Sequence, residues 1–336
     1  MRRRLHRAAA ILDREIDRRR RRPDGRVVIH PYRGFGRDEE LILRGRVLLE
    51  KQITRATAAE PVWRNVVNTW RRFLSEEIGG VRVVAAYRGA SAEAITDDEG
   101  YFRIVLSVPG LGRDALWHEV TLSLPEEGST ATAHVMTPTI ASQFAIISDI
   151  DDTVVVTNAT SLLGMARSVI RNAASRLPFE GVADLYAALH RGLNPIFYVS
   201  SSPWNLYDLL HDFMDLNEIP HGPMFLQDWG IDETTLIIAE HQTHKMAQIN
   251  ELLDFYPALR FVLIGDSGQH DPEIYLQVIQ AHRDRVAAAI IRDVTPDLRD
   301  RGVARILEAS NAAGVEMLYV KDSAEALGHA HRLGLT

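Results

Sequence analysis

The chain has 336 residues, of which 46% are hydrophobic and 25% are charged, and its formal net charge at pH 7 is −7. This length and composition allow one large core or two smaller ones, and we expect two domains. The chain contains no cysteine, which excludes disulfides, thiolate zinc sites and a cysteine nucleophile. Any metal must therefore be held by oxygen or histidine.

Targeting signals are not evident in the sequence. No run of about 18 apolar residues occurs, so we expect no membrane-spanning helix. The apolar stretch from Ala8 to Leu12 is short and flanked by arginine, unlike a signal peptide. We therefore expect a cytoplasmic protein.

Residues 1–26 form a basic N-terminal arm, with eleven arginines and a net charge of +7 that leaves −14 for the remainder. Four apolar residues recur on one face of a possible helix. The arginine run would suit contact with an anionic membrane, which would make the protein peripheral, while a solvated arm is the plainer interpretation. We expect no nucleic-acid partner. The apolar positions are Leu5, Ala9, Leu12 and Ile16.

Residues 27–140 show short runs of alternating apolar and polar residues, which predict an antiparallel β-sandwich. Apolar residues at helical spacing predict one inserted helix over residues 61–76, which we expect to pack on the core. The predicted strands are Leu41 to Leu49, Val81 to Tyr87, Tyr101 to Val108, Trp117 to Leu124 and Thr130 to Met136.

Residues 141–336 alternate between strand and helix patterns, which is typical of an α/β fold with a doubly wound parallel sheet. A last apolar run from Glu316 to Val320 would add an edge strand. The other strands are expected near residues 144–149, 195–200, 223–227, 260–265 and 287–292.

The first of these strands ends in Asp149, Asp151 and Thr153. Parallel strands place such residues at the carboxyl edge of the sheet, where ligands bind. Two neighbouring carboxylates resist joint ionisation unless a dication lies between them or one pKa rises. This pattern suits phosphoryl transfer, with Asp149 as the nucleophile and Asp151 as the proton donor. A calcium loop is excluded, because three of its required positions do not match.

Two further polar groups lie where a predicted strand ends or a predicted helix begins, so they too could contact a phosphoryl ligand. The strand near residues 195–200 ends in Ser200, Ser201 and Ser202, whose hydroxyls can bind a phosphoryl oxygen or simply cap a helix. His244 and Lys245 lie at the start of a helical pattern, where the lysine can neutralise a phosphoryl group.

The strand near residues 260–265 ends in Gly-Asp-Ser-Gly, with Asp266 followed five residues later by Asp271. We reject a serine-protease interpretation with Ser267 as nucleophile, because the segment alternates strand with helix and lacks the partners of that chemistry. Acidic residues after a parallel strand suit a hard cation.

Taken in order, Asp149 with Asp151, Ser200, Lys245, and Asp266 with Asp271 resemble the four motifs of the haloacid dehalogenase superfamily of phosphohydrolases. Longer strings are similar to the actin-patch-type phosphatidate phosphatase family over nearly the whole chain. They are SDIDDT, YVSSSPWN, His244-Lys245, GDSGQHDP, HPYRGFG, GRV, TDDEGYF and IRDV. The string DEGYF also resembles a turn of transthyretin-like sandwich domains.

The resemblance implies a Mg²⁺-dependent phosphatase that converts phosphatidate to diacylglycerol. It implies Mg²⁺ ligation by Asp149, the main-chain carbonyl of Asp151 and Asp266, with Asp271 bound directly or through water. The phosphoryl oxygens would be held by Ser200, Ser201 and Lys245, and Thr153 would brace the turn. Only about fifty residues separate Asp151 from Ser200, so we expect a small cap or none.

Two alternatives stay open. One is the same chemistry on a soluble phosphomonoester or a phosphoprotein. The other is a phosphatidate-binding module without turnover. The sequence gives neither the oligomeric state nor the role of the sandwich domain.

Overall fold

The computed structural model describes residues 25–50, 78–150, 153–154, 180–227, 237–268, 270–294 and 300–336. The predicted helix at 61–76 and residues 1–24 of the predicted basic arm lie outside the described residues, and so does Asp151. Much of the segment on which the small or absent cap was predicted, residues 155–179, also lies outside them. The domain limits at 26 and 140 remain predictions.

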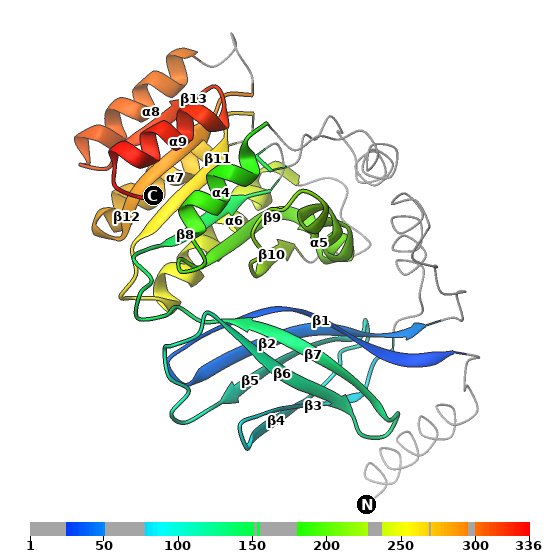
Figure 1. Cartoon of the computed structure of the whole chain (residues 1–336). Helices are drawn as coiled ribbons and strands as arrows, with labels where there is room; N and C mark the ends of the chain where they lie inside the picture. The colour runs from blue at the N-terminus through cyan, green and yellow to red at the C-terminus, as the bar shows by residue number, and fades with distance from the viewer. Residues whose placement is uncertain are drawn as a thin grey trace, which may run out of the picture.

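The first part of the chain is a β domain of seven strands, and the predicted antiparallel arrangement is confirmed for most of its pairs (Figure 1). Alternate residues of β5 and β6 are buried, as the period-two pattern requires. The strands are β1 (Arg26–Arg37), β2 (Glu40–Glu50), β3 (Arg82–Tyr87), β4 (Ala90–Ile95), β5 (Tyr101–Ser107), β6 (Trp117–Leu124) and β7 (Ser129–Met136).

These strands are hydrogen-bonded in the single order β4-β3-β6-β7-β1-β2-β5. The two outer strands, β4 and β5, nevertheless lie side by side, so the sheet curls around one apolar core. One pair departs from the antiparallel prediction, because β1 runs parallel to β7 at Gly34 and Phe35. The two layers expected of a sandwich are therefore joined through this short parallel contact.

The second part is an α/β domain with a six-stranded, wholly parallel sheet in the order β10-β9-β8-β11-β12-β13. The predicted doubly wound sheet is confirmed. Its strands are buried on both faces, which explains their continuous apolar runs. They are β8 (Ala145–Asp149), β9 (Ile196–Pro203), β10 (Met224–Gln227), β11 (Phe261–Asp266), β12 (Val286–Arg292) and β13 (Met317–Val320).

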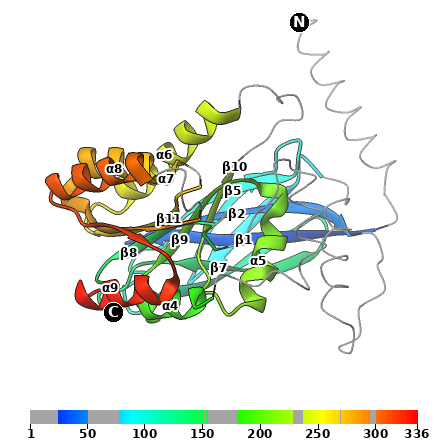
Figure 2. The same cartoon turned by 90° about the horizontal axis from the view of Figure 1, so that it is seen from above.

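Helices cover both faces of this sheet (Figure 2). One face packs on α4 (Val182–His190), α5 (Tyr207–Leu216) and α9 (Ser323–Arg332). The other packs on α6 (Ile237–Phe255), α7 (Asp271–His282) and α8 (Asp300–Ala312). The chain adds β9 and β10 on one side of β8 and then β11 on the other. The carboxyl ends of β8 and β11 therefore flank a topological switch point, where ligands bind in such sheets.

Two boundaries differ from the sequence prediction. The strand predicted near residues 195–200 continues to Pro203, and only the short 3-10 helix η1 (Trp204–Leu206) separates it from α5. The serines are thus strand residues and do not cap α5. The helix that contains Lys245 begins at Ile237, so His244 and Lys245 lie two turns inside it and not at its start.

The β domain packs its β1–β2–β7 layer against the α/β domain (Figure 1). Tyr32 stacks on Trp204 with ring centroids 5.1 Å apart. Phe35 contacts Phe225 at 5.2 Å and Phe255 at 5.1 Å. Such aromatic pairs add stabilisation beyond the apolar area that they bury. The string HPYRGFG therefore belongs to the interface between the two domains.

Candidate active site

The candidate site begins with two aspartates at the carboxyl ends of β8 and β11, which are adjacent strands. Asp149 is 1% exposed and Asp266 is 0% exposed. The register pairs Ile264 with Ser148, so both carboxylates lie just beyond the last paired residues of the two strands. This placement is consistent with the prediction that these side chains meet at one edge of the sheet.

Lys245 reaches the same point from α6. Its Nζ atom lies 2.8 Å from Oδ1 of Asp149 and donates a short hydrogen bond to Oδ1 of Asp271. Burial alone would lower the pKa of the Lys245 ammonium, but the carboxylates of Asp149 and Asp271 raise this pKa above its ordinary value. Lys245 is therefore a permanent cation inside the site.

Asp271 is the first residue of α7 and is fully buried. Its Oδ2 accepts the backbone N–H of Asp266 at 3.1 Å, while its Oδ1 accepts from Lys245. A Cβ placed on Gly265 would lie 2.2 Å from Oδ2 of Asp271. Only glycine therefore lets the start of α7 approach the end of β11 this closely. The Asp271 carboxylate links the ammonium to the β11 backbone.

These side chains form a group suited to a hard cation. Oxygen atoms of Asp149, Asp266 and Asp271 all lie within 4.8 Å of one another, and all three residues are buried. With these carboxylates ionised, they carry three negative charges, and within the described part of the chain Lys245 contributes one positive charge against them. Buried charge of this size is costly unless it is compensated. The donor set therefore fits an oxygen-coordinated dication such as Mg²⁺.

The remaining predicted residues lie around this group. The Thr153 hydroxyl donates to Oδ2 of Asp149 at 3.3 Å. Ser200 is 1% exposed and follows Val199, which is paired with Asp149 across the sheet. The Ser200 Oγ accepts the backbone N–H of Ser202 at 2.9 Å, and Ser201 is partly exposed. Asp151 lies outside the described residues, so its predicted role is not addressed by the structure.

Sequence reasoning missed a buried tyrosine that contacts the end of β8 beside Asp149. The Tyr186 hydroxyl of α4 lies 2.5 Å from Oγ of Ser148, which also donates to the main-chain oxygen of Asp149 at 2.7 Å. Burial raises the pKa of Tyr186, so its hydroxyl stays protonated. This pair holds the backbone where β8 ends. No local motif signals it, because Ser148 and Tyr186 are 38 positions apart.

Sequence reasoning also missed a link from the β domain to the serine strand. Arg46 of β2 donates to Oδ1 of Asn205 at 3.0 Å and to the carbonyl of Glu99 at 2.8 Å. Tyr101 donates to the same Asn205 oxygen at 3.1 Å. Asn205 ends the string YVSSSPWN, and Arg46 and Tyr101 lie in the strings GRV and TDDEGYF. The sequence signal that could have suggested this contact is that all three strings resemble segments of the same family.

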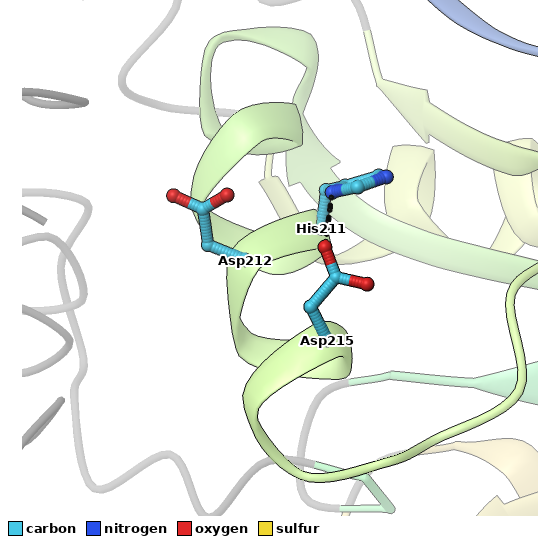
Figure 3. Close-up of side chains that lie close together, drawn as sticks. All are labelled: His211, Asp212 and Asp215. Carbon is cyan, nitrogen blue, oxygen red and sulfur yellow. Dashed lines mark ion pairs between the residues drawn. The ribbon is translucent and has the colours of Figure 1, made fainter. Parts of the chain in front are cut away.

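A second group of possible metal ligands lies on α5 (Figure 3). Nδ1 of His211 lies 3.3 Å from a carboxylate oxygen of Asp215, and a carboxylate oxygen of Asp212 lies within 4.8 Å of both residues. The second ring nitrogen of His211 lies 3.1 Å from the guanidinium of Arg33, and His221 contacts Asp215 at 2.6 Å. Because a cation already lies beside His211, this group is better suited to joining β1 to α5 than to holding a dication.

Residues 144–293 match the family model described as Phosphatidate phosphatase APP1, catalytic domain. The predicted resemblance to this family is confirmed. Over 192 residues, 54% of this chain, the sequence is 31% identical to Phosphatidate phosphatase APP1 of Saccharomyces cerevisiae and covers 32% of that protein. An uncharacterized protein of Schizosaccharomyces pombe is 25% identical over 243 residues, which are 68% of this chain and 40% of that protein. The chain thus spans well under half the length of these two relatives.

Solved structures give weaker similarity. A haloacid dehalogenase family hydrolase from Deinococcus radiodurans R1 has a TM-score of 0.33 and 14% identity, covering 58% of this chain and 98% of that chain. A phosphoserine phosphatase from T. onnurineus has a TM-score of 0.31 and 14% identity, covering 56% of this chain and 94% of that chain. These scores are too low to establish a shared fold.

Proposed function

We propose that this protein is a Mg²⁺-dependent phosphatidate phosphatase that works through an aspartyl-phosphate intermediate. The observation that supports it best is the buried contact between Lys245 and Asp149 inside the segment that matches the APP1 catalytic-domain family. A nucleophilic carboxylate held beside a fixed ammonium suits attack on an anionic phosphorus centre.

In the first step, an oxygen of Asp149 attacks phosphorus and the bond from phosphorus to the glycerol oxygen breaks. Asp151 donates its proton to that oxygen, which leaves as the hydroxyl of diacylglycerol. In the second step, Asp151 takes a proton from water as the water attacks phosphorus, and the bond to Asp149 breaks. Inorganic phosphate leaves, and both aspartates return to their starting states.

The other groups position the substrate. Lys245 and the hydroxyls of Ser200 and Ser201 would hold the phosphoryl oxygens, and Thr153 would keep the Asp149 carboxylate oriented. Asp149, Asp266 and the main-chain carbonyl of Asp151 would hold Mg²⁺, with Asp271 bound directly or through water. When bound, the ion would offset negative charge on the phosphoryl group.

The substrate would be reached at a membrane surface. No helix within the described residues combines the length and the apolar character that crossing a bilayer requires. The arginine-rich residues 1–26 would supply electrostatic attraction to anionic lipid.

The test is phosphate release from phosphatidate micelles, with and without Mg²⁺, for the unmodified protein and Asp149→Asn. We expect Mg²⁺-dependent release that falls at least about 10³-fold in the variant. Soluble phosphomonoesters and a phosphopeptide are assayed in parallel, and turnover of these alone would replace the lipid substrate with a soluble one. Liposome binding without release from any substrate would indicate a binding module and contradict the proposed catalysis.

A further inference from the structure

A pocket of about 560 Å³ lies between the β domain and α6, and we call it the interdomain pocket. Both domains line it, so it exists only where they pack together. Its volume lies within the range of pockets that hold one drug-sized ligand. Its lining includes Tyr32, Tyr101, Trp204, Phe225, Ala247 and Gln248.

The sheet register places this pocket beside the candidate active site. Asp149 of β8 is paired with Val199 of β9, and Val199 is paired with Phe225 of β10. Two spacings between neighbouring strands separate the Asp149 and Phe225 backbones by roughly 10 Å. Val199 and Phe225 belong to the core beneath α6, the helix that brings Lys245 to Asp149. Phe225 therefore lies on the same face of the sheet as Asp149. The pocket lies at the β10 edge, where Leu226 and Trp204 of the other face also line it.

Chain connections give the same placement. His244 lines the pocket and directly precedes Lys245. Trp204 also lines it and follows Ser200 by four residues, within the segment that leaves the end of β9. A substrate whose phosphate contacts Ser200 and Lys245 would thus have its remaining part directed toward this pocket.

The pocket offers aromatic surface, and its arginines and carboxylates are equal in number, with Arg44 and Arg103 opposed by Asp97 and Glu251. Tyr32 and Trp204 stack on each other, and Tyr101 lies under the Arg46 guanidinium. The partly exposed Arg44 is paired with Glu251 at 3.7 Å. The carboxylate of Asp97, also in the lining, accepts two backbone N–H groups. Such a surface suits an uncharged, partly apolar ligand better than a second phosphate.

Gln248 supplies a polar contact. This residue is 8% exposed; its Nε2 donates to the carbonyl of Leu226 at 3.4 Å and lies 3.3 Å from Nε2 of His244. Its Oε1 has no hydrogen-bond partner among the described residues. The unpartnered Oε1 would accept a hydrogen bond from a ligand hydroxyl, and an ester oxygen would instead accept one from Nε2. Glycerol esters present both kinds of oxygen next to an apolar chain.

We propose that the interdomain pocket binds the acylglycerol part of the substrate, with the glycerol oxygens at Gln248 and the first part of one acyl chain against Tyr101 and Trp204. This inference rests on the proposed phosphatase function, because it concerns the alcohol that the reaction releases. The β domain then takes part in substrate recognition by forming one wall of the pocket.

The test uses Ala247→Trp, which fills the pocket, and Gln248→Met, which keeps the side-chain length but removes the amide. The matched control is Ala258→Trp, which changes an exposed alanine outside the pocket lining. Phosphate release is measured on octanoyl lysophosphatidate below its aggregation concentration and on p-nitrophenyl phosphate. We expect Ala247→Trp and Gln248→Met to lower kcat/KM for the lipid about 10-fold or more, with little change for p-nitrophenyl phosphate.

A binding measurement separates this inference from the proposed function. Calorimetric titration with monooctanoylglycerol, which contains no phosphate, should show binding to the unmodified protein and to Ala258→Trp but not to Ala247→Trp. Equal losses on the lipid and on p-nitrophenyl phosphate, or unaltered monooctanoylglycerol binding in Ala247→Trp, would overturn the inference. Binding that follows the expected pattern in a protein that releases no phosphate would support the pocket while the phosphatase proposal fails.

Discussion

The ammonium of Lys245 lies 2.8 Å from Oδ1 of Asp149, although α6 and β8 supply these residues from positions 96 apart in the sequence. Both side chains are almost fully buried. The contact fixes the carboxylate within the group of acidic side chains that surrounds it, and it gives that group a permanent positive charge.

Replacing this lysine should impair both folding and catalysis. In Lys245→Met, the two buried carboxylates of Asp149 and Asp271 lose their shared cation, so we expect the free energy of unfolding to fall by about 3 kcal/mol. Phosphate release should fall about 10²-fold or more. Urea denaturation and an initial-rate assay measure the two effects. The control is Lys321→Met, which removes an exposed lysine; an equal response of both variants would contradict the role of the buried contact.

A single methyl group on Gly265 should disturb the site through Asp271. In Gly265→Ala the new Cβ would lie 2.2 Å from Oδ2 of Asp271, so that carboxylate must move. We expect a stability loss of about 1–3 kcal/mol and a decrease in phosphate release of about 10-fold or more. Gly302→Ala is the matched control, because no atom lies within 4 Å of the added Cβ. That change lies in α8 and should stabilise the protein by up to about 1 kcal/mol.

The contact between Arg46 and Asn205 should couple the two domains energetically. A double-mutant cycle with Arg46→Met and Asn205→Ala is expected to give a coupling free energy of about 1 kcal/mol or more, because the contact is largely shielded from water. The exposed pair Arg82 and Glu93, 3.3 Å apart, provides the comparison cycle, with a coupling expected below about 0.5 kcal/mol. Denaturation midpoints measure both cycles. An equal coupling free energy in both cycles would contradict the prediction that the Arg46–Asn205 contact couples the two domains more strongly than an exposed pair does.

His221 should make the protein less stable in mild acid. Burial and the nearby Arg33 lower the pKa of His221 to about 4. Between pH 6.5 and pH 4 the unfolded chain therefore binds a proton that the folded protein does not, so the free energy of unfolding decreases as the pH falls through this window. Replacing the ring by His221→Gln should make the pH dependence of Tm shallower there. His331→Gln, at an exposed position in α9, controls for the loss of a surface histidine, and an unchanged slope in His221→Gln would count against this account.

Much of the α/β domain follows from local sequence. Its strands are buried on both faces, so they appear as continuous apolar runs that end in polar residues. The positions of Asp149, Ser200 and Asp266 at one sheet edge then follow from parallel topology alone. Asp151 is the exception among the predicted residues, because it lies outside the described part of the chain.

The β domain was harder to predict at two strands. β4 has the sequence ASAEAI, and no residue in it is fully buried, so its apolar alternation is weak. β1 contains Pro31, Gly34 and Gly36, which interrupt a strand pattern. The contact from Arg46 to Asn205 joins residues 159 positions apart. No periodicity within either segment determines it, because it depends on how the two domains pack.

The aromatic contacts of Phe35 have a practical consequence for anyone preparing the α/β domain alone. A fragment without β1 would leave the rings of Phe225 and Phe255 facing solvent, where Phe35 now covers them. Exposed apolar patches of this kind favour aggregation. Poor yield or precipitation of such a fragment would then reflect its uncovered surface, and would carry no information about whether its chemistry is intact.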